Sequence, residues 1–219
     1  MGDFRMSLAD VVFVISRSSL HLWLKIWHRY EVRGAENVPQ TGGCLIASNH
    51  TSYIDPAAVS CGTRKRRAWF LARDTLYGGR KFFFDAFHCI PLNREHGEVA
   101  ALRKSIQMLK DGHMLALFPE GTRSLDGRLQ PGQSGIGFIV VKAGQPVVPA
   151  LVQGAFEAYP KGAKWVRPIK VRVTYGKPIL PDEFAALGGG RDHYARVSRL
   201  IMERIAALGP VPPPPAAAG

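Results

Sequence analysis

The sequence is poor in cysteine and in long apolar runs, and each shortage excludes a class of protein. Its three cysteines, Cys44, Cys61 and Cys89, lie far apart and form no C-x-x-C pair. We therefore expect reduced, buried thiols in a protein on the cytosolic side, with neither a disulfide framework nor a structural zinc site. No run reaches the roughly 20 apolar residues that span a bilayer. The N-terminus also lacks the pattern of a signal peptide, because its apolar run from Val11 to Ile15 is too short.

Acidic residues are scarce relative to basic ones. The chain has 29 Lys and Arg against 17 Asp and Glu, which gives a formal net charge of +12. Such an excess indicates a polyanionic partner, either nucleic acid or an anionic membrane surface, or else an anionic substrate. Charge alone does not choose among these three.

The length of 219 residues suits one hydrophobic core, and no stretch resembles a linker between two domains. We expect an N-terminal helix over 1–30, a folded domain over 31–208 and a disordered tail, rich in Pro and Ala, over 209–219. Short apolar runs alternate with stretches of helical periodicity, which predicts a single layered α/β domain with a mixed, largely parallel sheet flanked by helices. The expected strands are 44–48, 68–72, 88–94, 114–118, 147–152 and 169–173, and the expected helices are 6–30, 98–111, 136–143 and 192–207.

Residues 6–30 predict an amphipathic helix that is apolar over most of its circumference. Its polar residues form a single stripe, made of Asp10, Arg17, His21, Lys25 and His28. A wide apolar face with tryptophans beside a basic stripe suits a helix that lies in a membrane interface. A helix packed on the domain's own core is the alternative, and the segment alone leaves both open. The basic run over 64–67 is either a solvated turn or a further contact with an anionic surface, where each charge adds about 1 kcal/mol.

The stretch from Asn49 to Pro56 follows an apolar run, 44–48, that predicts a buried strand. Pro56 suits the first position of a helix, and Asp55 suits its cap. His50 would then lie at the strand end and Asp55 one short loop later, so the two side chains can fold back on each other. A carboxylate on one imidazole nitrogen fixes the tautomer, and the other nitrogen can take a proton from an alcohol. The plainer alternative is a capping Asp55 and a polar loop residue His50.

A second polar segment, 118–124, also follows a predicted strand, and ligands of open α/β sheets are commonly held at strand ends. Arg123 offers a bidentate fork for phosphate, and Thr122 and backbone N–H groups near Gly121 offer further donors. Arg94, at the end of another predicted strand, can supply a second positive charge. A single Arg in a polar loop is, however, more often part of a surface ion pair than a ligand.

Together these segments resemble the motifs of the glycerolipid acyltransferases. Residues 50–55 match the H-x-x-x-x-D motif, and residues 118–124 match the F-P-E-G-T-R-S motif in full. Residues 90–94 are similar to the arginine-bearing motif of that family, and residues 148–150 to its fourth, proline-containing motif. One such motif is weak evidence, but the four in order are specific. The chain resembles the membrane-associated 1-acylglycerol-3-phosphate acyltransferases of phospholipid biosynthesis.

The resemblance implies an O-acyltransferase reaction and a role for each motif. His50 would be the general base and Asp55 its orienting partner. They would help move a fatty acyl group from a thioester, either acyl-CoA or acyl carrier protein, to the free hydroxyl of 1-acylglycerol-3-phosphate, which gives phosphatidic acid. The glycerol-phosphate head of the acceptor would be bound by Arg94, Glu120, Gly121, Thr122 and Arg123. No covalent acyl-enzyme is expected, since the chain has no G-x-S-x-G elbow, and no metal or cofactor is needed.

Two departures from the family pattern concern the acceptor. His88 stands where the arginine motif usually begins with glycine, and Gln130-Pro131 stands where a lysine is common shortly before Gly132. An acceptor with another head group, such as a lyso-aminolipid, is therefore an alternative. A non-catalytic basic protein on membrane or nucleic acid is a rival from another class, but it leaves the ordered motifs unexplained, so nucleic acid is not the expected partner. We expect a peripheral or monotopic enzyme on the anionic, cytoplasmic face of the cell membrane.

Overall fold

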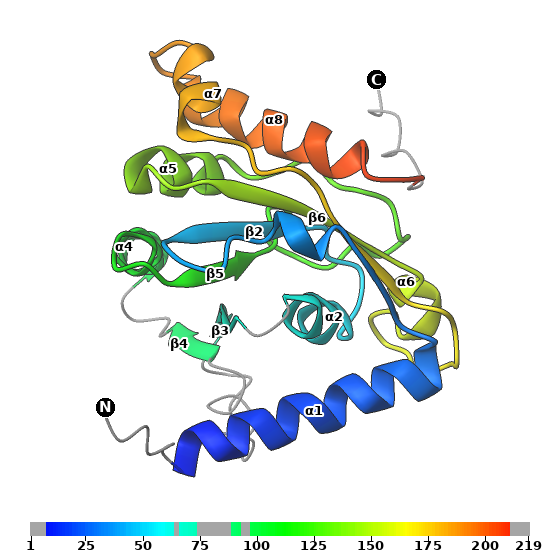
Figure 1. Cartoon of the computed structure of the whole chain (residues 1–219). Helices are drawn as coiled ribbons and strands as arrows, with labels where there is room; N and C mark the ends of the chain where they lie inside the picture. Colours follow the sequence, from blue (N-terminus) through cyan, green and yellow to red (C-terminus); the bar gives the residue numbers. More distant parts are fainter. Residues whose placement is uncertain (1–7, 64–65, 74–88, 93–96, 211–219) are drawn as a thin grey trace.

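The computed structural model describes residues 8–63, 66–73, 89–92 and 97–210, and its centre is a seven-stranded sheet (Figure 1). The strands are β1 (Glu31–Arg33), β2 (Cys44–Ser48), β3 (Ala68–Arg73), β4 (Cys89–Leu92), β5 (Met114–Leu117), β6 (Val147–Gln153) and β7 (Arg172–Tyr175). They lie in the order β1-β7-β6-β2-β5-β3-β4. Neighbours run parallel except for β6 and β7, which are antiparallel. The predicted mixed, largely parallel sheet is therefore confirmed.

Each face of the sheet buries its own core, because successive strand residues point to opposite faces. In β2, Cys44 and Ile46 join one core, while Leu45 and Ala47 join the other. All five residues of β2 are buried, as expected for a strand that is covered on both sides. The first core lies under α1 (Leu8–His28), α2 (Asp55–Gly62) and α6 (Ala155–Ala158), and the second lies under α4 (Gly97–Lys110), α5 (Ser134–Ala143), α7 (Pro181–Ala186) and α8 (His193–Ala206).

The predictions missed the shortest elements. Strand β1, the 3-10 turn η1 (Ala35–Asn37), α6 and α7 are too short to show a periodicity in the sequence. The strand predicted at 169–173 begins later, at Arg172, and alternates in burial as expected. Strand β1 pairs beside it and forms the edge of the sheet. There Glu31 is ion-paired with three basic residues, Arg33, Lys170 and Arg172.

Helix α1 packs on the domain with one face and leaves an apolar face exposed. Phe13, Leu24 and His28 are buried. The predicted polar stripe turns partly inward, since His28 is fully buried and Arg17 donates hydrogen bonds to α2. The exposed apolar residues are Val11, Val14, Ile15, Leu22, Trp23, Ile26 and Trp27. In the described part of the chain, no helix has both the length and the hydropathy to cross a bilayer.

The basic run over 64–67 is partly structural. The Arg66 guanidinium donates hydrogen bonds to the backbone carbonyls of Pro39, Gly42 and Gly112, and thereby ties the loop before β2 to the turn before β5. The Arg67 guanidinium lies 4.5 Å from the ring centroid of Phe13 in α1. Arg66 is therefore neither a solvated turn residue nor directed at an anionic surface. Residues 64 and 65 lie outside the described residues.

Candidate active site

The turn from β2 into α2 brings His50 and Asp55 together, as the sequence predicts. His50 Nδ1 lies 2.9 Å from Asp55 Oδ2. The Asp55 side chain is fully buried, whereas the imidazole is 18% exposed. An ionised carboxylate only accepts hydrogen bonds, so with Asp55 ionised Nδ1 carries the proton and Nε2 keeps a lone pair. This arrangement can take a proton from an alcohol that reaches the imidazole.

Asp55 is not the helix cap that the sequence predicts. Helix α2 begins at Asp55 itself, the residue before it is Ile54, and no side chain caps the helix. Instead, Asp55 Oδ2 accepts the backbone N–H groups of Thr51 at 2.6 Å and Ser52 at 2.7 Å, in addition to the imidazole of His50. Because Asp55 Oδ2 accepts these N–H groups of the loop, it does not accept the first N–H groups of the helix. Three donors on one oxygen fix the position of the carboxylate and of the loop that carries His50.

The second motif holds the backbone and the ring of His50. Glu120 Oε1 accepts the His50 N–H at 3.1 Å, and the Ser124 N–H donates to the His50 carbonyl at 2.8 Å. The imidazole stacks on the ring of Phe118, with 3.9 Å between centroids and 15° between planes. Strands β2 and β5 are parallel neighbours, so the motifs that follow them meet at the carboxyl ends of these two strands. The two motifs form a single site.

Asn49 is a supporting residue that the sequence reasoning did not select. Its buried side-chain amide donates to the Val152 carbonyl at 2.9 Å and accepts the Val152 N–H at 2.7 Å. It thereby ties the end of β2 to β6, directly before His50. The available signal was an amide next to the histidine, because an Asn side chain can both donate to and accept from the backbone of one residue.

The side chain of Glu120 is buried next to His50. Burial raises the pKa of Glu120 to about 7, which the backbone N–H groups of His50 and Gln130 partly oppose, and the charge of Asp55 raises it further. Its Oε2 has no hydrogen-bond partner among the described residues. Gly121 follows with φ 71°, and a Cβ there would overlap the side chain of Gln133, so the turn requires glycine.

Arg123 lies over the loop that carries the His50–Asp55 pair. Its guanidinium carbon is 3.6 Å from the ring centroid of Tyr53, a residue of that loop. Its buried Nη1 has no hydrogen-bond partner within the described residues, so the guanidinium keeps a donor for a ligand. Thr122 is exposed next to it. Arg94, the other predicted phosphate ligand, lies outside the described residues.

Cys44 and Cys61 take no part in this site. Cys44 and Cys61 are buried and unpaired, as predicted. Burial raises the pKa of each thiol to about 11, which keeps both in the unreactive, protonated form. Where side chains are described, no three or more His, Cys, Asp or Glu residues are grouped as metal ligands.

Comparison with known proteins identifies the family. The sequence model of the acyltransferase family matches residues 29–153, a span that holds both motifs and most of the sheet. The chain belongs to the acyltransferase family. It is an O-acyltransferase.

Individual relatives of the acyltransferase carry a more specific name. It is 26% identical over 196 residues to the 1-acyl-sn-glycerol-3-phosphate acyltransferase of Bacillus subtilis. This match covers 87% of the present chain and 94% of the Bacillus protein. It is 31% identical over 169 residues to a chloroplastic 1-acyl-sn-glycerol-3-phosphate acyltransferase of Brassica napus, a match over 72% of this chain and 48% of the plant protein. The crystal structure of the 1-acyl-sn-glycerophosphate acyltransferase of Thermotoga maritima has the same fold, with a TM-score of 0.72 and 25% identity over 94% of this chain and 84% of the other.

Proposed function

We propose that the enzyme transfers a fatty acyl group from a thioester to the free hydroxyl of 1-acylglycerol-3-phosphate. The observation that carries the mechanism is the 2.9 Å contact between His50 Nδ1 and the buried Asp55. His50 Nε2 removes the proton of the acceptor hydroxyl as its oxygen attacks the thioester carbonyl. The C–S bond then breaks, and the departing thiolate takes the proton from the imidazolium. General-base catalysis of this kind typically contributes ~10²–10⁴ in rate.

Asp55 stabilises the imidazolium through its contact with Nδ1 and holds the ring in the productive tautomer. Glu120 and Phe118 keep the imidazole from turning away, because one binds its backbone and the other stacks on its ring. The donor is either acyl-CoA or acyl carrier protein, and the reaction consumes no cofactor.

Arg123 is the candidate ligand for the phosphate of the acceptor. Its guanidinium lies over Tyr53, in the loop that carries His50, and keeps a donor without a partner among the described residues. A planar fork binds a phosphate through two parallel hydrogen bonds. Gly121 and Thr122 directly precede Arg123 in the chain, and we propose backbone N–H groups of this turn and the exposed Thr122 hydroxyl as further donors, with Arg94 as a second cation. The names of the relatives in Bacillus and Thermotoga support lysophosphatidate rather than another lysolipid as the acceptor.

We also propose that α1 holds the enzyme on the membrane surface. Its exposed face combines aliphatic residues with Trp23 and Trp27, which suits a helix that lies in the bilayer interface without crossing it. The net charge of +12 favours an anionic surface such as the cytoplasmic leaflet. On a membrane this apolar face would contact lipid instead of water.

The direct test is to follow free CoA released from acyl-CoA with a panel of lysolipids. We expect release with lysophosphatidate and much less with lysophosphatidylcholine or a lyso-aminolipid. Equal rates with all head groups would reject the acceptor assignment. Vesicle binding without CoA release under any condition would favour a non-catalytic membrane protein.

A further inference from the structure

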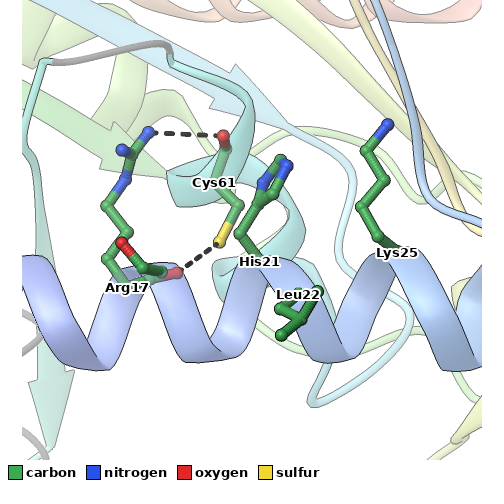
Figure 2. A pocket seen from close by; sticks show the side chains of 6 residues that line it. Arg17, His21, Leu22, Lys25 and Cys61 are labelled. Atoms are coloured by element: carbon green, nitrogen blue, oxygen red, sulfur yellow. Dashed lines mark hydrogen bonds between the residues drawn. The ribbon is translucent and has the colours of Figure 1, made fainter.

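A groove of about 460 Å³ lies between α1 and the C-terminal end of α2 (Figure 2). Arg17, His21 and Lys25 recur every four residues, so they form one row along α1. None of the lining side chains that the structure describes is acidic. The groove is lined by Arg17, Ser18, His21, Leu22, Lys25 and Cys61.

The basic groups of this groove are held in place by the fold. The Arg17 guanidinium donates to the carbonyls of Ser60 and Cys61, both at 3.3 Å, in the last turn of α2. The His21 ring meets the Tyr30 ring edge-on, with 5.8 Å between centroids. Lys25 Nζ lies 6.0 Å from the centroid of the same Tyr30 ring. Arg17 is therefore anchored on α2 by two hydrogen bonds, and the His21 and Lys25 side chains lie beside the Tyr30 ring.

The positive charges of Lys25 and Arg17 disfavour a proton on His21 when the groove holds no anion. The pKa of His21 is lowered by burial and by the neighbouring charges of Lys25 and Arg17. A bound phosphate would offset that repulsion and favour the protonated imidazole. The groove therefore has the charge and the donors of an anion site.

The position of the groove on α1 indicates which anion reaches it. Leu22, on its rim, is 59% exposed and belongs to the apolar face that also carries Ile15 and Ile26. If that face is buried about 5–10 Å into the boundary between head groups and acyl chains, the flank of a helix about 10 Å across lies at the level of the lipid phosphates. The groove is also separated from Arg123, because it lies at the far end of α2 from Asp55.

We infer that this groove binds the phosphate of an anionic bilayer lipid, with Lys25 and His21 as the contacting groups and Arg17 as a fixed neighbouring charge. The inference rests on the proposed membrane contact of α1. It goes beyond that contact by giving the surface a lipid preference and a site that is distinct from the acceptor site. A bound lipid would also orient α1, and with it the attached α2, relative to the bilayer.

The first test compares Lys25→Gln with Arg29→Gln in the full chain. Both variants remove one positive charge from an exposed residue at the same end of α1, but only Lys25 lines the groove. We expect Lys25→Gln to weaken binding to vesicles of phosphatidylcholine with phosphatidylglycerol about fivefold, which corresponds to about 1 kcal/mol for a charge near the surface. Arg29→Gln should weaken it much less, and neither variant should change binding to phosphatidylcholine alone. Equal losses in the two variants would reject a specific groove.

The second test follows the imidazole of His21 by NMR in bicelles. The groups that face it are Arg17 and Lys25 on α1, Cys61 on α2, and Tyr30. Burial raises the pKa of Cys61 to about 11 and also raises the pKa of Tyr30, so neither titrates near neutral pH. We expect the His21 pKa to be higher in bicelles with phosphatidylglycerol than in neutral ones. No rise, or an equal rise with inorganic phosphate in neutral bicelles, would overturn the lipid assignment.

A third measurement separates this inference from the proposed reaction. In neutral detergent micelles Lys25→Gln should keep the kcat and the KM for lysophosphatidate of the parent enzyme. A raised KM there would make the groove part of the acceptor site and overturn the inference. Failure of the His50 mechanism would leave the vesicle results unchanged, whereas a parent protein that binds no vesicles would overturn the groove and the membrane proposal together.

Discussion

The backbone N–H of His50 donates a 3.1 Å hydrogen bond to Oε1 of Glu120, although the two residues are 70 positions apart in the chain. The contact exists because β2 and β5 are neighbours in the sheet and both motifs begin where those strands end. The carboxylate of Glu120 therefore positions the backbone of His50. The family resemblance implies only that it binds the acceptor. Glu120 is buried, and its pKa is accordingly raised to about 7.

Glu120→Gln is expected to remove a pH dependence of stability. A folded-state pKa of about 7 against an ordinary value of 4.5 means that the folded protein binds the proton more tightly. The contribution of protonated Glu120 to the stability of the folded protein is fully present below the ordinary pKa and is lost as the pH rises through about 7. The amide has no charge to bury, and its oxygen can still accept the His50 N–H. Between about pH 5 and pH 8 the free energy of unfolding of the variant should therefore rise relative to the parent, by on the order of 3 kcal/mol. Urea unfolding at both pH values measures this, and parallel pH curves would contradict it.

Asn49→Ala is expected to destabilise the protein and slow the reaction together. The substitution leaves the Val152 N–H and carbonyl without their side-chain partner inside the core, which costs about 2–3 kcal/mol. It also frees the end of β2 next to His50, so turnover should fall further than unfolding alone explains. Gln107→Ala serves as the control, because its hydrogen bond to Asp111 is exposed and its loss should cost less than about 0.5 kcal/mol. Unchanged stability of Asn49→Ala would show that the amide does not tie β2 to β6.

Arg123→Lys is expected to raise the KM for lysophosphatidate with a smaller effect on kcat. Lysine is a point charge, so it cannot reproduce the fork toward phosphate or the planar contact with Tyr53. The matched control is Arg128→Lys, in the same loop, where the guanidinium forms an exposed ion pair with Asp126 and no other ion pair within the described residues. Steady-state kinetics on both variants measure the effect. An unchanged KM in Arg123→Lys would mean that the phosphate binds elsewhere.

The paired substitution Leu22→Ser and Ile26→Ser is expected to weaken vesicle binding and leave the fold intact. Both side chains are exposed on α1, so the stability cost in water should stay within about 0.5 kcal/mol for each. Two large aliphatic side chains are worth about tenfold or more in partitioning when they enter an apolar phase. Cosedimentation with vesicles and thermal unfolding on the same preparations measure the two effects.

The control for that pair is Leu24→Ser, on the buried face of the same helix, which should unfold the protein rather than release it from vesicles. Deletion of residues 1–29 is less informative, since it also removes Arg17 from the carbonyls of α2. Unchanged cosedimentation of the double serine variant would reject membrane contact through α1.

The sequence predicted the parts of the site that depend on local order along the chain. The His50–Asp55 contact spans one short turn, so a strand signal followed by a helix signal was enough to place it. The capping role of Asp55 was wrong, because the N–H groups of Thr51 and Ser52 compete for the same oxygen and that competition depends on the loop geometry. The contact of Glu120 with His50 was not predictable, since it depends on which strands become neighbours.

Helix α1 shows a second limit of the same kind. Periodicity separated a polar stripe from an apolar face, but it did not tell which of them meets the domain. The stripe turns inward because Arg17 donates to the Ser60 and Cys61 carbonyls at the end of α2, and His28 Nδ1 contacts the Ile169 carbonyl. Those partners come from distant segments, so only the folded chain reveals them.

The central claim is that His50 and Asp55 act as one catalytic unit, and turnover measured beside thermal unfolding in three variants tests it most directly. The variants are His50→Ala, Asp55→Asn and the double substitution. The contacts of His50 with Glu120 and Ser124 use backbone atoms, so His50→Ala should keep a melting temperature close to that of the parent. It should lose ~10²–10⁴ in turnover, and Asp55→Asn should lose most of its activity through the wrong tautomer. The double variant should be scarcely slower than His50→Ala, because members of one unit are not additive. Acyl transfer retained by a well-folded His50→Ala protein would contradict the mechanism.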